Sequence, residues 1–162
     1  MRWLLVDTID ELVVNSSIKG TKTYHATEEF FQDHFPGFPV VPGVLLMESL
    51  AQLAGKLIGY TVAKTRGDWP FPILSMMNGV KFRKFVPPDT PITLEAELIS
   101  LRDEMAAVKV WAKVGKKVHA QAEQIFVFNA VPLADETERK RVQRIESEEM
   151  KRLWQAYPND LI

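Results

Sequence analysis

Two ionisable side chains lie fourteen positions apart in the stretch DHFPGFPVVPGVLLMESLAQLAG, which runs from Asp33 to Gly55. His34 precedes a loop rich in proline and glycine, and Glu48 lies among leucine, methionine and alanine. An unpaired ionised carboxylate is costly in apolar surroundings, so Glu48 must be paired, neutral or facing a cavity. Apolar surroundings favour the protonated carboxyl group, which suits a proton donor at neutral pH.

The loop after His34 is suited to holding a general base in place. Its prolines restrict the backbone, and Gly37 and Gly43 allow unusual dihedral angles. Gly43 opens the following helix, so its N–H and the helix dipole can point at a developing oxyanion. A base, an acid and an oxyanion site together suit proton abstraction next to a carbonyl group.

Each of these residues also has a structural interpretation. Glu48 can form a hydrogen bond with Gln52 or reach solvent through a gap, and a lone histidine is more often structural than catalytic. His25 and His119 lie in strand-like patterns, and we interpret both as structural residues.

The elements around this stretch indicate one long buried helix. Apolar or small residues occupy nearly every angle of the segment from Pro42 to about Ala63, which is typical of a buried helix. Pro42 suits the first helical position, where its missing N–H costs nothing.

Downstream segments alternate like strands and are joined by short connections, which predicts an antiparallel meander. We therefore expect an α+β fold in which a curved antiparallel sheet wraps the central helix. The expected strands are Ile18–Thr27, Val80–Val86, Pro91–Leu101, Ala106–Val114 and Val118–Phe128, and a short helical turn is expected after Thr27 as N-cap.

Composition excludes several classes of protein. The chain has 162 residues, no cysteine and a net charge of −1, which argues against a disulfide scaffold, a thiolate nucleophile and nucleic-acid binding. The apolar run near the N-terminus is too short for a signal peptide, and no run is long enough for a membrane span. The expected protein is cytoplasmic, without a membrane partner.

The last part of the sequence has a different character. Residues 1–133 are expected to form one domain, and residues 134–162 a charged helical extension. Asp135 and Glu138 form a plausible capping pair. Val142, Ile145, Leu153 and Trp154 make a sparse apolar stripe that would dock the helix, although Trp154 and Tyr157 could instead pack on a neighbouring subunit.

The stretch HFPGFPVVPGVLLMESLAQ resembles the signature of the FabA/FabZ-type 3-hydroxyacyl-acyl-carrier-protein dehydratases, which have the hot-dog fold. The gapless match includes His34, Gly37, Pro39, Pro42, Gly43, Glu48 and Gln52. A weaker resemblance extends over about residues 5–130. Glutamate at position 48 resembles the FabZ branch, because the FabA branch, which also isomerises the double bond, typically has aspartate there.

The resemblance implies a dehydratase of type II fatty-acid biosynthesis without a metal or redox cofactor. His34 would remove the α-proton of a 3-hydroxyacyl thioester, and Glu48 of the partner subunit would protonate the leaving hydroxyl group. The Gly43 N–H would polarise the thioester carbonyl, the Val40 carbonyl would orient the His34 ring, and Gln52 would support Glu48. Activity would require a homodimer, and three dimers often assemble into a hexamer.

The resemblance also implies an acyl tunnel between subunits and an acyl carrier protein as partner. Lys81, Arg83 and Lys84 are candidates for contact with the acidic carrier, although a solvated strand face is the simpler interpretation. The candidate tunnel residues, each of which could equally be ordinary core, are Phe38, Met47, Met76, Met77 and Phe82.

Three features depart from the family pattern: Phe38 replaces a more usual polar residue, RKFVPPD replaces RRPVxPGD, and the charged tail is additional. They leave open a dehydratase of a specialised acyl or polyketide pathway, or an acyl thioesterase, which would not need His34 on a stiff loop. A non-catalytic acyl-carrier-binding subunit is a further alternative.

Overall fold

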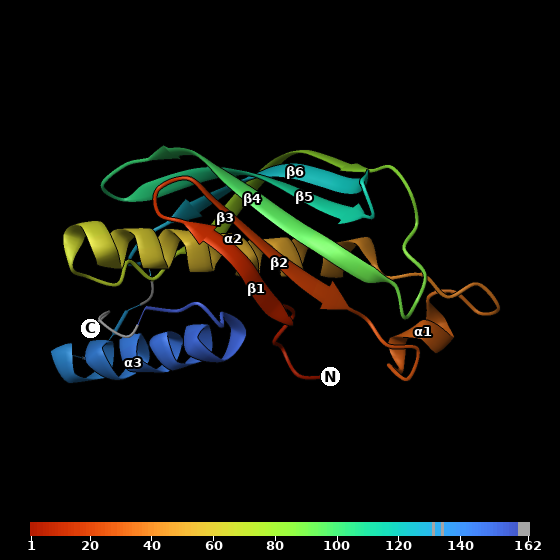
Figure 1. The fold of residues 1–162 in the computed structure, drawn as a ribbon, viewed down its shortest axis with the longest axis horizontal. Coiled ribbons are helices and arrows are strands. Elements are labelled where there is room, and N and C mark those ends of the chain that lie inside the picture. Colours follow the sequence, from red (N-terminus) through yellow and green to blue (C-terminus); the bar gives the residue numbers. More distant parts are fainter. Residues whose placement is uncertain (131, 134, 159–162) are drawn as a thin grey trace.

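The fold of the chain is given by a computed structural model, which describes residues 1–130, 132–133 and 135–158. A six-stranded antiparallel sheet wraps a long helix, α2, and a second long helix, α3, lies on the other side of α2 (Figure 1). The elements in chain order are β1 (Thr8–Val13), β2 (Ser17–Thr23), α1 (Phe30–Asp33), α2 (Gly43–Arg66), β3 (Ile73–Phe82), β4 (Pro91–Leu101), β5 (Met105–Val114), β6 (Lys117–Val127) and α3 (Glu136–Leu153).

The strand order is β1-β2-β4-β5-β6-β3. The predicted meander is confirmed for β4, β5 and β6, but it is wrong for the strand before them, because β3 pairs with β6 and not with β4. That strand also runs from Ile73 to Phe82 instead of Val80–Val86. The segment after β3 leads to β4, which lies between β2 and β5. In this segment Val86 is buried, and its carbonyl accepts the Val41 N–H at 2.8 Å.

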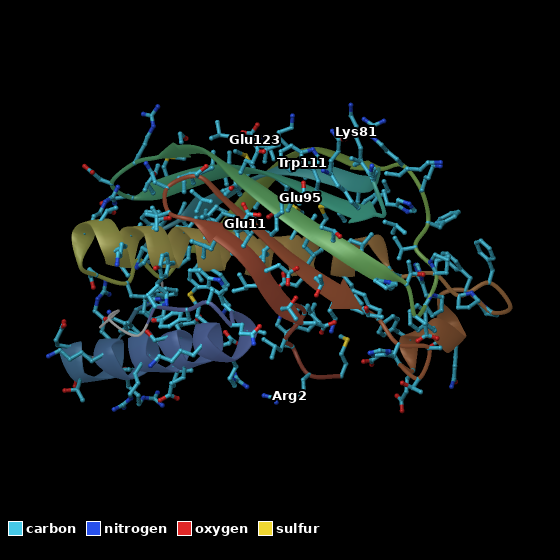
Figure 2. The ribbon with its side chains drawn as sticks, viewed as in Figure 1. Arg2, Glu11, Lys81, Glu95, Trp111 and Glu123 are labelled. Atoms are coloured by element: carbon cyan, nitrogen blue, oxygen red, sulfur yellow. The ribbon has the colours of Figure 1, made fainter. Side chains whose placement is uncertain are left out.

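The sheet has one buried and one exposed face, as its alternating sequence predicts. On β5, Val108, Val110 and Ala112 are buried against α2, whereas Lys109 and Trp111 alternate with them. Figure 2 shows Glu95, Trp111 and Glu123 on this outer side of the sheet. Most of the core therefore lies between the sheet and α2, and residues of α3 and the segment after it add to it on the other side of α2.

Two glycines shape helix α2, one directly after its last residue and one in its middle. Gly67 follows it with φ 73°, a left-handed conformation that glycine adopts without strain. Gly59, in its middle, meets the ring of Trp69 so closely that an added Cβ atom would lie 2.0 Å from the ring. The helix predicted over residues 42–63 is confirmed and extends to Arg66, but it begins at Gly43 with Pro42 as N-cap, so the placement of Pro42 at the first helical position is wrong.

The expected N-cap at Thr27 is wrong. The short helix α1 begins at Phe30 with Glu29 as N-cap, and no side chain caps it. Phe31 is buried as predicted, and Phe30 packs against the core.

Helix α3 begins as its sequence predicts, because the Asp135 carboxylate accepts the Glu138 N–H at 2.9 Å. Leu153 and Trp154 are buried, whereas Ile145 of the predicted stripe is exposed and Met150 takes its place in the core. The aromatic ring of Trp154 packs edge-on against Tyr60 within the same chain. Of the predicted extension 134–162, residues 134 and 159–162 lie outside the described residues.

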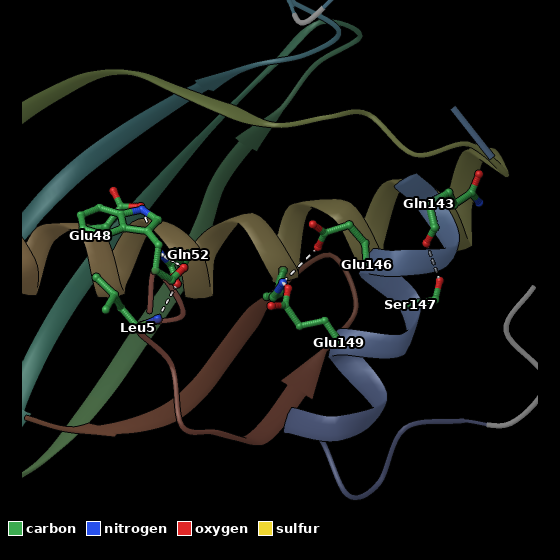
Figure 3. A network of polar contacts seen from close by, with 9 residues as sticks. Leu5, Glu48, Gln52, Gln143, Glu146, Ser147 and Glu149 are labelled. Carbon is green, nitrogen blue, oxygen red and sulfur yellow. Dashed lines mark hydrogen bonds and ion pairs between the residues drawn. The ribbon is translucent and has the colours of Figure 1, made fainter. Parts of the chain in front are cut away.

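Charged contacts also join α3 to the rest of the chain. Lys56 of α2 is only 8% exposed and forms ion pairs with Glu146, at 3.0 Å, and with Glu149 (Figure 3). Arg139 bonds to both oxygens of the Asp68 carboxylate, and this contact lowers the pKa of Asp68. These pairs hold α3 against the side of α2 that the sheet leaves uncovered.

A buried hydroxyl pair fixes the first turns of α2 to Tyr24, the residue directly after β2. The Tyr24 hydroxyl lies 2.5 Å from the Ser49 hydroxyl and donates to the Leu45 carbonyl at 3.1 Å. Burial raises the pKa of Tyr24 from 10.0 to about 12, and the Ser49 hydrogen bond opposes this shift.

We expect the contribution of Tyr24 to stability to disappear at high pH. Because its pKa is raised in the folded state, that contribution is complete below pH 10 and is lost as pH rises through about 12. A shift of two pKa units corresponds to about 2 to 3 kcal/mol. Urea unfolding at several pH values gives the free energy of unfolding of wild type and of Tyr24→Phe. The difference between these two free energies should change only above pH 10. An equal difference at pH 8 and pH 11.5 would contradict this account.

Candidate active site

His34 is the C-cap residue of α1 and begins the loop that follows this helix. Its N–H donates to the Phe30 carbonyl at 3.0 Å, and its own carbonyl accepts the Val40 N–H at 3.1 Å. In the side chain, Nδ1 lies 3.2 Å from the Val40 carbonyl oxygen. A carbonyl only accepts, so Nδ1 carries the hydrogen and Nε2 keeps the lone pair that a base requires.

Glu48 lies on the second turn of α2 and is half-buried. Its Oε1 accepts the Gln52 amide at 3.2 Å and the Trp3 indole N–H at 3.1 Å. The Gln52 oxygen in turn accepts the Leu5 N–H at 2.8 Å (Figure 3). The carboxylate is therefore paired with neutral donors, one of which the sequence predicted and one of which it did not.

Glu48 also faces a cavity of about 720 Å³ between α2, the start of β3 and α3. Its lining includes Glu48, Gln52 and Lys56 from α2, and Ile73 and Leu74 from β3. His34 is not among the lining residues, so a single chain does not bring the two ionisable residues to one cavity.

Gly43 is the first residue of α2, where a backbone N–H has no partner within its own helix. A Cβ atom there would lie 2.7 Å from the ring of Phe82, so a larger residue would require this exposed ring to move. Phe82 itself ends β3 and is exposed in the single chain.

The remaining candidate tunnel residues fall into two groups. Met47 is buried in the core, and its carbonyl accepts the amide of the buried Gln124 at 3.0 Å. Met76 and Met77 are exposed on β3, and Phe38 is exposed in the loop, with its ring 5.7 Å from that of Phe85. None of the five lines the cavity at Glu48.

The three basic candidates lie together at the end of β3. Lys81 belongs to the strand, Arg83 and Lys84 follow it, and all three side chains are exposed. Arg83 is held by the Gln121 oxygen at 3.1 Å. The exposed ring of Phe85 comes next, so cationic and apolar surface are adjacent.

Sequence reasoning missed Trp3 altogether. It lies 45 positions before Glu48, in a segment whose spacing predicts no contact with α2. In the described residues, no cluster of three or more His, Asp and Glu side chains is arranged to hold a metal ion. No helix in the described part of the chain is long and apolar enough to span a membrane.

Solved structures share this fold. The dehydratase heterocomplex ApeI:P from Xenorhabdus doucetiae matches with a TM-score of 0.66 and 13% identity, over 86% of this chain and 89% of that chain. A protein described as a hypothetical thioesterase from Streptococcus pneumoniae, determined with coenzyme A, matches with a TM-score of 0.57 and 11% identity, over 75% of this chain and 86% of that chain. At such identities the likeness shows the fold, and the hot-dog prediction is confirmed.

Sequence comparison shows the family. A family model described as a FabA-like domain matches residues 1–123. Two proteins named 3-hydroxyacyl-[acyl-carrier-protein] dehydratase FabZ are among the relatives. The one from Pediococcus pentosaceus is 42% identical over 82% of this chain and 87% of its own length; the one from Lactobacillus helveticus is 45% identical over 76% and 82%. The chain therefore belongs to the FabA-like dehydratase family, and within it resembles the FabZ proteins.

Proposed function

We propose that the protein is a (3R)-hydroxyacyl-acyl-carrier-protein dehydratase of type II fatty-acid biosynthesis. The observation that carries this proposal is the 42% identity to a protein named FabZ dehydratase over 132 residues, in a chain that has both His34 and Glu48 in the family's motif. The reaction class is that of a hydro-lyase, which removes water from its substrate.

In the proposed step, Nε2 of His34 takes the α-proton of the 3-hydroxyacyl thioester. The electron pair of that C–H bond becomes the new double bond, the C–O bond at carbon 3 breaks, and Glu48 gives its proton to the departing oxygen. The products are a trans-2-enoyl thioester and water, with His34 protonated and Glu48 ionised until the proton returns. Only protons move and one C–O bond breaks, so the step itself calls for neither a redox cofactor nor a metal.

The neighbouring residues have supporting roles in this proposal. The Val40 contact to Nδ1 supports the tautomer in which Nε2 is the base. The Gly43 N–H, at the start of α2, would stabilise negative charge on the thioester oxygen. Gln52, bonded to Glu48 at 3.2 Å, would hold the acid in position.

We propose that the site forms across a homodimer, with His34 from one subunit and Glu48 from the other. The separation of His34 from the cavity at Glu48 supports this arrangement. Strand β3 supports it too, because it is a sheet edge whose exposed side chains include Met76, Met77 and Phe82, and uncovered apolar edges pair readily with another chain. Assembly of three dimers into a hexamer remains a prediction.

The proposed partner is an acyl carrier protein, and no nucleic-acid or membrane partner is proposed. Lys81, Arg83 and Lys84 would attract the acidic carrier, since exposed charges of this kind mainly raise the rate of association. The acyl chain would lie between the subunits, against Phe38, Met76, Met77 and Phe82, with Met47 behind them. The proposed location is the cytoplasm, which cell fractionation would test.

The experiment that tests the function compares two thioesters of the same chain length. With a 3-hydroxyacyl thioester, purified protein should produce enoyl absorbance and release no free thiol. A plain acyl thioester should remain intact. Release of thiol from both would instead identify a thioesterase, and no reaction with either would support a non-catalytic carrier-binding subunit.

A further inference from the structure

We propose that Trp3 is a positioning residue for the acid Glu48. Its indole N–H, together with the Gln52 amide, holds Oε1 of the carboxyl group and leaves Oε2 to carry the proton used in the reaction. This inference deepens the proposed function and rests on it.

The first observation is that two donors converge on one oxygen. The Trp3 indole and the Gln52 amide bond to Oε1 of Glu48 at 3.1 Å and 3.2 Å. From the residues that the structure describes, no hydrogen bond reaches Oε2 of the same carboxyl group. The two oxygens of Glu48 are thus in different environments before any substrate is bound.

The second observation is that the segment carrying Trp3 is anchored. The Gln52 amide accepts from the Leu5 N–H at 2.8 Å and donates to the Trp3 carbonyl at 3.4 Å, so it holds the main chain on both sides of Leu4 (Figure 3). Leu5 and Val6 are almost completely buried. The indole therefore extends from a fixed backbone, although its own side chain is 62% exposed in the single chain.

The chemistry of a carboxyl group makes this asymmetry useful. A protonated carboxyl has one carbonyl oxygen, which accepts hydrogen bonds well, and one hydroxyl oxygen, which donates. Two N–H donors on Oε1 favour it as the carbonyl oxygen, so the acidic proton resides on Oε2. Trp3, Glu48 and Gln52 line the same cavity, where a substrate hydroxyl group could meet that proton.

The same two bonds become stronger as the reaction proceeds. When Glu48 gives up its proton, negative charge develops on the carboxylate, and hydrogen bonds to charged acceptors are about twice as strong as neutral ones. An interaction that strengthens toward the transition state raises kcat and leaves substrate binding largely unchanged. Trp3 should therefore affect turnover and not KM.

The test replaces Trp3 by phenylalanine, which keeps an aromatic ring and removes the N–H donor. We expect Trp3→Phe to lower kcat about tenfold, the effect of about one hydrogen bond, with KM within about twofold of wild type. Trp111→Phe, on the outer face of β5, is the matched control and should change neither quantity.

A second measurement needs no activity. In protein labelled with nitrogen-15, the indole N–H signal that is missing from Trp3→Phe belongs to Trp3. We expect this signal to lie at different chemical shifts in the wild type and in Glu48→Ala, because alanine offers the indole N–H no acceptor. An indole signal at the same position in both proteins, or an unchanged kcat in Trp3→Phe, would overturn the inference.

The outcomes for the two proposals can be told apart. If wild type dehydrates and Trp3→Phe matches it, only the role of Trp3 is wrong. If wild type does not dehydrate, the proposed function fails and the role of Trp3 in catalysis fails with it, whatever the indole signal shows about the hydrogen bond.

Discussion

Replacing His34 by glutamine is expected to lower kcat for dehydration by about a thousandfold, within the range that a general base contributes. Glutamine can still donate to the Val40 carbonyl, which bonds to Nδ1 of His34 at 3.2 Å, but it has no nitrogen lone pair to accept the α-proton. The measurement is the initial rate of enoyl absorbance from a 3-hydroxyacyl thioester, with the melting temperature recorded alongside it.

The matched control for this change is His25→Gln. His25 is exposed, and its Nδ1 lies 3.5 Å from the Asp89 carboxylate. Its replacement should leave the rate unchanged. If His34→Gln retained more than about a tenth of wild-type turnover, His34 would not be the base.

Replacing Glu48 by glutamine is expected to have an effect of similar size, again about a thousandfold on kcat. The amide oxygen can still accept from Trp3 and Gln52, which bond to Oε1 at 3.1 Å and 3.2 Å, so the side chain should keep its place. An amide cannot protonate a leaving hydroxyl group, however, and the C–O bond would have to break to form a hydroxide ion.

Glu97→Gln provides the control for the loss of one carboxylate. Glu97 is exposed on β4, and its replacement removes the same charge without touching the cavity. Full activity in this variant and near-complete loss in Glu48→Gln are expected. Comparable rates in the two variants would show that Glu48 does not supply the proton.

The central part of the fold could be predicted because its signals are local. Helix α2 is apolar on nearly every face, and β4, β5 and β6 alternate over much of their length and are joined by short turns. The place of β3 could not be predicted, because the short segment before β4 looks like a hairpin connection. In the structure Val86 is buried in the middle of that segment, which leads from the edge strand β3 past β6 and β5 to β4.

In the candidate site, too, contacts between residues close in the sequence could be predicted, and contacts between distant residues could not. The contact of Gln52 with Glu48 follows from a spacing of four residues on one helix. The contact of Trp3 with Glu48 joins residues 45 positions apart, and Lys56 meets Glu149 over 93 positions. Sequence periodicity does not predict such contacts, because they depend on how separate elements pack against one another.

The central claim is that His34 of one subunit and Glu48 of the other act on one substrate, and mixed dimers test it most directly. His34→Gln and Glu48→Gln, each inactive alone, are expressed together in equal amounts. Random pairing makes about half of the dimers mixed, and one of the two sites in each mixed dimer has both residues intact. The account predicts recovery of about a quarter of wild-type activity. A co-expressed sample that stays as inactive as the single variants would contradict it.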